Sequence, residues 1–335
     1  MKNHVFIDHY NHTAIGKKNA AGKAPQDCGR ILTEYGYHGL HLYISRSDVA
    51  KSLLSWGRVL TMIPYKADVV IQYPLGESNF VITSILDVCR LKNCKITLLV
   101  HDLSSLRYSG HLSRSEVGVL SKANNIIVHN DAMKGLLSEY IPHARYYCLQ
   151  AFDYFINRPA RPHDFDNTIV YAGNLRKSLF LPYLRNLGVK FNLYGVETEE
   201  LKSACNELVK YKGAFTQEDL SILSGDWGLV WDGTSATTCD GNMGHYMRYN
   251  APHKLSLYLV AQLPVIIWSQ AAEAKLIKEN KLGILINSLG DIKETIQGIT
   301  LEEYAKMKNN VMEYSKKLMR GGNLNSVLNE MKADV

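Results

Sequence analysis

A lysine at the start of a predicted helix is the residue of this chain best placed to bind phosphate. Residues 226–232 and 264–268 are short apolar runs bounded by turn residues, which indicates buried parallel strands. Between them, Asn250 suits an N-cap, Pro252 suits the first turn of a helix, and Lys254 lies in that turn. Backbone N–H groups and the helix dipole attract phosphate there, and Lys254 adds a full charge. The same pattern also fits an ordinary crossover helix whose lysine points to solvent.

A second cationic turn follows the predicted strand at residues 168–171. Gly173, Asn174, Arg176 and Lys177 come directly after this strand. The glycine permits a tight turn and a close approach of ligand to backbone, and the two cations supply charge for a diphosphate. The alternative is that both cations are solvated turn residues. The turn is not GxGxxG, and the sequence contains no P-loop, which argues against dehydrogenases and P-loop NTPases.

His101 and Asp102 follow a third apolar run, residues 95–100, and are the acid/base candidates. Carboxyl ends of strands in open α/β sheets line the ligand crevice. Either residue could act as a general base while the other orients it, or both could cap the next turn.

Composition limits the class of protein. The 335 residues predict about two domains, and a hydrophobic content of 46% fits a globular chain with a sizeable core. The longest apolar runs are far below the roughly 20 residues of a membrane span. Charge and histidine come too early for a signal peptide, and the six scattered cysteines form no CxxC pair. We therefore expect a cytoplasmic protein without structural zinc.

The positive charge lies in the first half of the chain. Residues 1–160 hold 18 Lys+Arg and 12 Asp+Glu, whereas residues 161–335 hold 20 of each. The excess makes the first half the better partner for an anionic acceptor or for peripheral contact with the inner face of the membrane. Solvated surface charge is the more common explanation of such an excess. Neither a basic run nor a nucleic-acid motif is present, so DNA and RNA are not expected partners. The triplet 164–166, the only Asp-x-Asp, precedes a strand, so no metal site is expected.

Strand and helix patterns alternate twice along the chain. A parallel, doubly wound sheet is predicted for each half, separated by the proline-rich linker 157–163 and followed by a helical tail. The predicted strands are residues 5–7, 40–44, 67–72, 95–100 and 125–128, then 168–171, 190–194, 227–231, 265–268 and 283–286. The predicted boundaries are 1–156 for the first domain, 157–163 for the linker, 164–310 for the second domain and 311–335 for a C-terminal helix.

Several of these blocks together carry a family resemblance. The sequence closely resembles bacterial β-1,6-galactofuranosyltransferases of O-antigen synthesis in five blocks, at residues 100–102, 170–175, 228–233, 249–254 and 263–265. Those enzymes are relatives of the glucosyltransferases that glycosylate streptococcal serine-rich adhesins. The block Asn250 to Lys254 is the specific part, and the resemblance spans most of the chain.

The resemblance implies a GT-B fold: two Rossmann-like domains facing across a cleft, with the donor bound by the second, the acceptor by the first, and the last helix crossing back. It implies a metal-independent, inverting transferase that needs no cofactor and moves a hexose, first of all galactofuranose, from a UDP-sugar to a glycan acceptor. Retaining relatives carry two glutamates before the Pro-Val strand, but no acidic residue lies between Asp240 and Glu273 here. A lipid-linked acceptor and a homo-oligomer are left open. The alternatives are a UDP-glucose-dependent adhesin glucosyltransferase and a non-catalytic nucleotide-sugar-binding subunit.

The resemblance also assigns roles to residues. His101 and Asp102 become the catalytic pair, and Arg176 meets the diphosphate. The backbone around Gly213 holds the nucleotide base. Apart from the resemblance, the glycine and lysines of the loop 17–23 fit either closure over the donor or a flexible solvated loop. The expected donor-binding residues are Asn19, Gly173, Asn174, Arg176, Lys177, Gly213, Asn250, His253 and Lys254.

Overall fold

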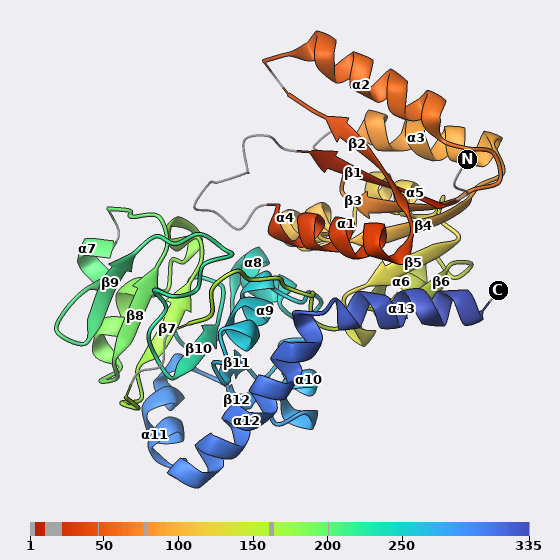
Figure 1. Ribbon diagram of the computed structural model, residues 1–335. Helices are drawn as coiled ribbons and strands as arrows, with labels where there is room; N and C mark the ends of the chain where they lie inside the picture. Colours follow the sequence, from red (N-terminus) through yellow and green to blue (C-terminus); the bar gives the residue numbers. More distant parts are fainter. Residues whose placement is uncertain are drawn as a thin grey trace. The chain divides into compact units, whose positions relative to one another are not determined.

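Two parallel β-sheets form the framework of the computed structural model, which describes residues 4–10, 22–45, 47–76, 79–160, 164–199 and 201–334 (Figure 1). The first has the spatial order β2-β1-β3-β4-β5-β6, and the second β9-β8-β7-β10-β11-β12. The first sheet contains β1 (His4–Tyr10), β2 (His38–Tyr43), β3 (Asp68–Tyr73), β4 (Lys95–Val100), β5 (Asn125–Val128) and β6 (Arg145–Cys148). The second contains β7 (Ile169–Ala172), β8 (Phe191–Tyr194), β9 (Val209–Gly213), β10 (Trp227–Val230), β11 (Val265–Trp268) and β12 (Gly283–Ile286). The predicted α/β class is confirmed.

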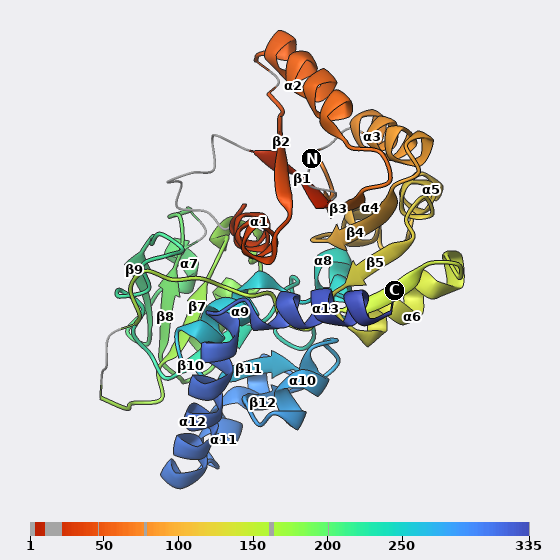
Figure 2. The same ribbon diagram turned by 45° about the vertical axis from the view of Figure 1, so that its right-hand side comes forward.

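Helices cover both faces of the first sheet, so its central strands are apolar throughout. In β5 all four residues are buried, and in β3 and β4 all but the first. Helices α2 and α3 lie on one face, and α1 lies on the other (Figures 1 and 2). The helices of this part are α1 (Lys23–Tyr35), α2 (Val49–Met62), α3 (Asn79–Leu91), α4 (Ser104–Ser109), α5 (Arg114–Leu120), α6 (Asp131–Tyr140) and α13 (Gly322–Ala333). Helix α1 is followed by Gly36, whose φ of +111° suits a glycine.

The second sheet is built around large aromatic side chains. Trp227, Trp231 and Trp268 are fully buried in its core. Thr300 and Glu303 form a capping box at the start of the long helix α12. The helices of the part that contains the second sheet are η1 (Leu175–Lys177), η2 (Leu181–Asn186), α7 (Leu201–Ala204), α8 (Gly241–Tyr246), α9 (His253–Val260), α10 (Ala274–Glu279), η3 (Leu289–Asp291), α11 (Ile292–Gln297) and α12 (Leu301–Leu318).

Two edge strands, β6 and β9, were not predicted from the sequence. Each has only one fully buried residue, Tyr147 in β6 and Val209 in β9. An edge strand packs on fewer neighbours, so its sequence lacks the apolar run that marks a central strand. The segment around Gly213, expected to be a loop, is therefore the end of a strand.

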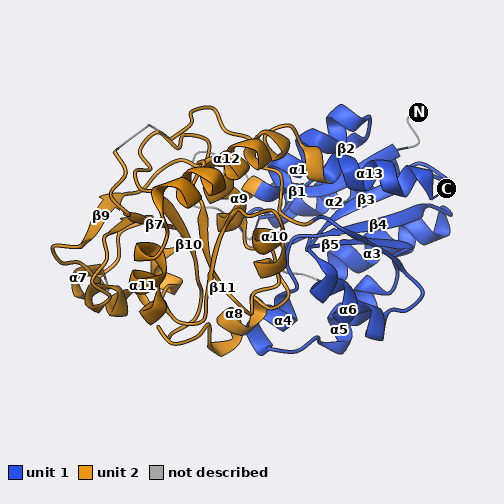
Figure 3. Ribbon diagram, turned by 90° about the horizontal axis from the view of Figure 1, so that it is seen from below, with its two compact units in different colours: residues 1–15, 24–149, 324–335 blue, residues 16–23, 150–323 orange. Residues whose placement is uncertain are grey.

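The chain divides into two compact units (Figure 3). The first comprises Met1–Ile15, Ala24–Leu149 and Leu324–Val335, and the second Gly16–Lys23 and Gln150–Asn323. The first unit thus reaches Leu149 and not residue 156, because Ala151 and Tyr154 are buried in the core of the second. The start of the predicted linker also belongs to the second unit, since Asn157 N–H donates to the carbonyl of Glu218 at 2.7 Å.

The C-terminal stretch is fastened to the first unit by side-chain hydrogen bonds. The Tyr35 hydroxyl donates to Asn329 Oδ1, and the Tyr147 hydroxyl donates to Asp334 Oδ2 at 2.9 Å. The predicted boundary at 310/311 falls inside α12, and the helical break lies after Leu318. Among the helices of the described ranges, none combines the length and the apolar character required to span a bilayer.

Candidate functional site

The second sheet reverses its strand order between β7 and β10. Strands β8 and β9 lie beyond β7, whereas β11 and β12 lie beyond β10. In open α/β sheets, ligands bind outside the carboxyl ends of the strands at such a reversal. The segments after Ala172 and Val230, together with helix α9 between β10 and β11, are therefore the candidate binding elements.

Lys254, in the first turn of α9, connects the two strands at this point. Its Nζ donates to the Tyr171 hydroxyl and the Trp231 carbonyl, both at 3.1 Å, and to Asp232 Oδ1 at 3.2 Å. Its side chain is 15% exposed, so the alternative in which it points to solvent is wrong. Burial alone would lower the pKa of Lys254, but Asp232 together with the hydroxyls of Tyr171 and Tyr258 raises it overall. A permanent positive charge is thus fixed where the strand order reverses.

Tyr258, one turn further along α9, makes a second connection to β7. Its hydroxyl accepts a hydrogen bond from the Ala172 backbone N–H at 2.8 Å. The ring packs so closely on β10 that a Cβ at Gly228 would lie 2.3 Å from Tyr258 Cγ. Glycine at position 228 therefore makes room for the ring that ties α9 to β7.

The turn after β7 is open to solvent. A Cβ at Gly173 would have no heavy atom within 4 Å, so the backbone there is accessible to a ligand. Asn174, Arg176 and Lys177 are all exposed, with the two cations on the short helix η1. The structure therefore places these predicted residues at the same carboxyl edge as Lys254.

Glycines also follow the next two strands. Gly195 comes directly after β8, and a Cβ there would lie 2.3 Å from the Gly173 carbonyl oxygen. Gly195 N–H donates to the Gly213 carbonyl at 3.1 Å, and its own carbonyl accepts from the Tyr211 hydroxyl at 2.9 Å. Gly213, with φ of +99°, has open space where a side chain would lie. Gly173 and Gly213 were predicted from the sequence, whereas Gly195 was not, although a glycine directly after an apolar strand is a recognisable signal.

Asn250 is not the N-cap that was expected, and His253 is an uncharged, stacked ring. The N-cap of α9 is Pro252, and not Asn250, whose buried Oδ1 has no hydrogen-bond partner. The His253 ring stacks on Tyr154 with 4.9 Å between centroids, and its buried Nε2 also lacks a partner. Burial lowers the pKa of His253 to about 3, so the ring is neutral at pH 7 and brings no charge to an anion.

Most of the predicted loop 17–23, Asn19 included, lies outside the described residues. At its end, Lys23 is buried, with its Nζ 3.7 Å from Glu218 Oε1 and 5.2 Å from the centre of the Tyr154 ring. Lys23 is therefore a packed side chain, whereas a phosphate-steering lysine would face solvent.

Asp240 organises the threonine-rich loop after β10. Its Oδ1 accepts from the backbone N–H groups of Thr234 at 2.6 Å and Ser235 at 3.1 Å. Its Oδ2 accepts from the Thr234 hydroxyl at 2.9 Å. These bonds close a turn, the alternative to sugar binding that is common for such aspartates.

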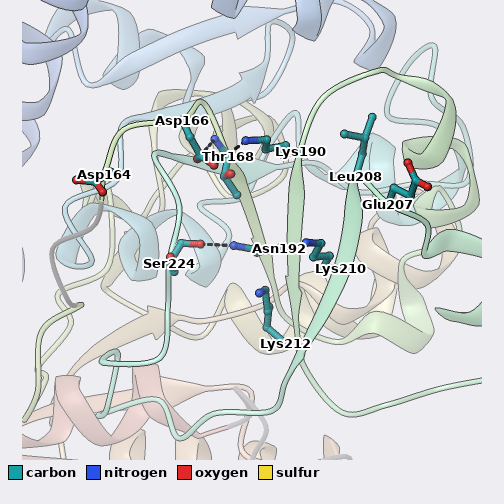
Figure 4. Close-up of a pocket in the computed structure, with 10 residues that line it drawn as sticks. All are labelled: Asp164, Asp166, Thr168, Lys190, Asn192, Glu207, Leu208, Lys210, Lys212 and Ser224. Atoms are coloured by element: carbon teal, nitrogen blue, oxygen red, sulfur yellow. Dashed lines mark hydrogen bonds and ion pairs between the residues drawn. The ribbon is translucent and has the colours of Figure 1, made fainter.

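A polar cavity of about 310 Å³ lies elsewhere in the second unit (Figure 4). Thr168 and Lys190, which line it, come just before β7 and β8, so it adjoins the amino ends of these strands. Figure 4 shows Asn192 bonded to Ser224 across it, and Lys190 beside Asp166. Because ligand sites of open sheets occupy the opposite edge, this cavity is not the candidate donor site.

In the first unit, His101 lies at the end of β4, close to the reversal between β1 and β3. Its Nε2 is 2.7 Å from Gln72 Oε1, and Gln72 Nε2 in turn donates to the Pro25 carbonyl at 3.0 Å. With Gln72 oriented in this way, its oxygen accepts, and Nε2 of a neutral His101 carries the proton. Nδ1 is then the basic nitrogen of the ring.

Asp102 is held by a separate partner. Its Oδ2 accepts from Arg107 Nη1 on α4, whereas its Oδ1 is buried without a hydrogen-bond partner. Helix α4 is itself anchored by the buried Glu116, whose carboxylate accepts from the backbone N–H groups of Ser104 at 3.0 Å and Ser105 at 3.1 Å. Glu116 therefore positions Asp102 through α4 and Arg107. Among the described residues, no group of three or more His, Cys, Asp or Glu side chains could hold a metal ion.

Comparison with known proteins identifies the family. The model for the "Glucosyltransferase 3-like, N-terminal domain" matches residues 5–149, and that for the "Glucosyltransferase 3-like, C-terminal domain" matches residues 169–331. The chain belongs to the glucosyltransferase 3-like family. The chain is 28% identical to the β-1,6-galactofuranosyltransferase WbbI of Escherichia coli (strain K12), over 97% of this chain and 98% of the relative. It is 24% identical to glucosyltransferase 3 of Streptococcus gordonii, over 89% and 90%.

Solved structures support the fold that this family implies. Sucrose-phosphate synthase from Thermosynechococcus elongatus aligns with a TM-score of 0.66 at 11% identity, over 98% of both chains. Anabaena Alr3699/HepE in complex with UDP aligns with a TM-score of 0.65 at 12% identity, over 100% of both chains. The predicted GT-B fold, with two Rossmann-like domains, is confirmed, and the chain is a glycosyltransferase.

The residues that surround Lys254 were not recognised as site residues from the sequence. Tyr171 and Tyr258 were interpreted only as parts of a predicted strand and helix, and Asp232 as the end of the predicted strand at residues 226–232. No local signal marks them, because Tyr171 and Lys254 are far apart in the chain and meet only through the sheet order.

Proposed function

We propose that this glycosyltransferase moves a hexose from a UDP-sugar to a hydroxyl of a surface-polysaccharide acceptor, with inversion at the anomeric carbon. The observation that carries the proposal is the charged Lys254 at the reversal between β7 and β10, with Arg176 open to solvent at the same edge. Two cations at the carboxyl edge of a Rossmann-like sheet suit a ligand whose charge is concentrated in a diphosphate. The neighbour HepE was solved with UDP, which agrees with this ligand class.

The two cations have different roles in this proposal. Lys254 uses its three N–H groups on protein oxygens, so it acts on the diphosphate through its charge. Arg176 is exposed and forms direct hydrogen bonds to the phosphate oxygens. The open backbone at Gly173 and Gly213 leaves room for the nucleotide. Asn174 and Lys177 lie beside Arg176 and line the same binding site. As the sugar–phosphate bond breaks, charge develops on UDP, and these fixed cations stabilise it without a metal.

The general base is assigned to the first unit. In an inverting transfer, the acceptor oxygen attacks the anomeric carbon from the face opposite UDP and loses its proton to the base. Asp102 has an unused oxygen lone pair at Oδ1 and is oriented through Arg107, so we assign the proton to Asp102. His101 is the second candidate, through Nδ1.

The donor sugar proposed first is galactofuranose, because WbbI, a β-1,6-galactofuranosyltransferase, aligns over nearly the whole chain. Glucose is the alternative, supported by glucosyltransferase 3 of Streptococcus gordonii over a slightly smaller share. Incubation with UDP-galactofuranose, UDP-galactopyranose and UDP-glucose, followed by NMR of the product, distinguishes the sugars. A β-linked furanoside supports the first proposal, and an α-linked product would overturn inversion.

A non-catalytic nucleotide-sugar-binding subunit is the remaining alternative. Thermal unfolding with and without millimolar UDP tests nucleotide binding, because a ligand that binds only the folded state raises Tm. A transfer assay then separates an enzyme from a binding subunit. We expect UDP to raise Tm and NAD to leave it unchanged. Equal shifts would overturn the nucleotide-sugar assignment, whereas UDP binding without transfer to any acceptor would favour the subunit.

A further inference from the structure

Helix α2 in the first unit turns an apolar surface to solvent. Val49, Leu53 and Leu54 are 61%, 57% and 75% exposed. Phe80, at the start of the neighbouring α3, is 68% exposed, and its ring lies 5.7 Å from that of Trp56. We call these five residues the α2 face. Figures 1 and 2 both show α2 at the margin of the first sheet, beside α3.

The polarity of α2 is inverted relative to an ordinary surface helix. Its inward side attaches to the segment around β2 through hydroxyls, because Ser55 Oγ accepts from Tyr43 N–H at 2.8 Å and Ser52 Oγ accepts from Ser45 N–H at 2.9 Å. Val59 is the one fully buried residue of the helix. A surface helix normally buries its leucines and exposes its serines. The exposed leucines of α2 therefore do not serve the core, and several exposed apolar side chains on one helix indicate an interaction surface.

The charge around the α2 face is positive. The exposed side chains of Lys51, Arg58 and Lys66 accompany the apolar residues. In the fully described stretch 47–67, Asp48 is the only acidic residue, and its Oδ1 caps the helix by accepting from Lys51 N–H at 3.0 Å. Apolar side chains beside basic ones, on a helix lying along a surface, are the combination that binds anionic lipid headgroups.

We propose that the α2 face docks the protein on an anionic membrane, with Leu53 and Leu54 entering the headgroup region and Lys51 and Arg58 contacting lipid phosphates. Charge complementarity selects this occupant over a second copy of the chain, whose identical face would oppose like charges. The inference does not depend on which sugar is transferred, nor on the transferase assignment itself.

The test is co-sedimentation of the full chain with vesicles of phosphatidylcholine alone, or of phosphatidylcholine and phosphatidylglycerol in equal parts. We expect binding to the anionic vesicles that weakens as salt is raised. Leu53→Ser/Leu54→Ser should lower the partition coefficient at least about tenfold, because two exposed apolar side chains are lost. Lys51→Gln/Arg58→Gln should abolish most of the preference for the anionic vesicles. Tm should stay near that of the parent in both variants.

The matched control is Ile222→Ser/Leu301→Ser, which removes two exposed apolar residues of the second unit, 43% and 69% exposed. It should bind vesicles like the parent chain. No binding by the parent, or equal binding by Leu53→Ser/Leu54→Ser, would overturn the proposal. The proposal would also be overturned if the parent chain self-associates in sedimentation velocity but does not bind vesicles, and if Leu53→Ser/Leu54→Ser is monomeric. UDP binding, measured in parallel, separates this outcome from failure of the proposed function.

Discussion

The carboxyl edges of the two sheets carry the charged residues predicted to act on the substrate, but they are organised differently. In the second unit, the ammonium of Lys254 is saturated by three oxygens from both sides of the strand reversal. In the first, Asp102 gives one oxygen to Arg107 and keeps the other buried and unbonded. A saturated cation provides a constant electrostatic field, whereas a carboxylate with an unused oxygen can accept a proton. Under the proposed mechanism, this difference means that one edge holds a fixed charge and the other accepts a proton.

The largest expected effect tests the proton-accepting edge. Asp102→Asn should lower turnover about 10²–10⁴-fold while UDP binding stays near that of the parent, because an amide keeps the size but cannot accept the proton. Steady-state kinetics and calorimetry with UDP measure the two quantities separately. His101→Gln is the matched variant, and a fully active Asp102→Asn enzyme beside an inactive His101→Gln would move the base to the histidine.

The next effect tests the charge-holding edge. Lys254→Ala should lower the free energy of unfolding by about 2–3 kcal/mol, somewhat below the cost of breaking a fully buried pair, since it leaves Asp232 half-buried without its cation. UDP binding should weaken as well. Denaturant unfolding measures the first, and the double variant Lys254→Ala/Asp232→Ala should recover part of the loss. Unchanged stability in the single variant would show that the pair does not hold the two strands.

Acid sensitivity gives an effect of intermediate size. The folded-state pKa of His253, about 3 against an ordinary 6.5, means that the unfolded chain takes up this proton first as the pH falls. The stability due to the neutral ring is therefore complete above pH 6.5 and is lost progressively toward pH 3. Between pH 7.5 and 5, the parent should lose about 2 kcal/mol more than His253→Phe, which keeps the stack on Tyr154. Parallel stability profiles would show that Nε2 is solvated.

A smaller effect tests whether Arg176 binds phosphate through direct hydrogen bonds or only through its charge. Arg176→Ala should weaken UDP binding about tenfold and leave Tm unchanged, because an exposed arginine has no folding role to lose. Lys177→Ala, one residue along the same short helix, is the matched control and should weaken binding less. Equal effects of the two variants would mean that only the summed charge of the turn matters.

The smallest expected effect is none at all. Transfer should persist in excess EDTA, because fixed cations are proposed to stabilise the leaving diphosphate. Activity that is lost in EDTA and restored by magnesium or manganese would assign that role to a metal, and Lys254 would no longer be needed to explain it.

The sequence predicted the buried parts of the fold well and the contacts between distant segments poorly. The strand ending before His101 and the strand at 265–268 were placed correctly, because strands buried on both faces are apolar throughout. Edge strand β9 escaped because its burial alternates. Lys254 was found from its place in a helix start, but its partner Tyr171 was not, since only the sheet order brings them together. The role of Glu116 was likewise not predicted, because only the fold brings its carboxylate to the first N–H groups of α4.

Gly228 has a consequence for redesign of the donor specificity. Because the strand has no side chain there, Tyr258 can reach Ala172, and Lys254 one turn earlier reaches Tyr171, so α9 and β7 are pinned together at two successive points. The frame that carries the charge extends into the segment after β10, because Lys254 also binds the Trp231 carbonyl and Asp232. A redesign of the loops would therefore keep these two residues, and even an alanine at 228 would displace the Tyr258 ring and break its hydrogen bond to Ala172.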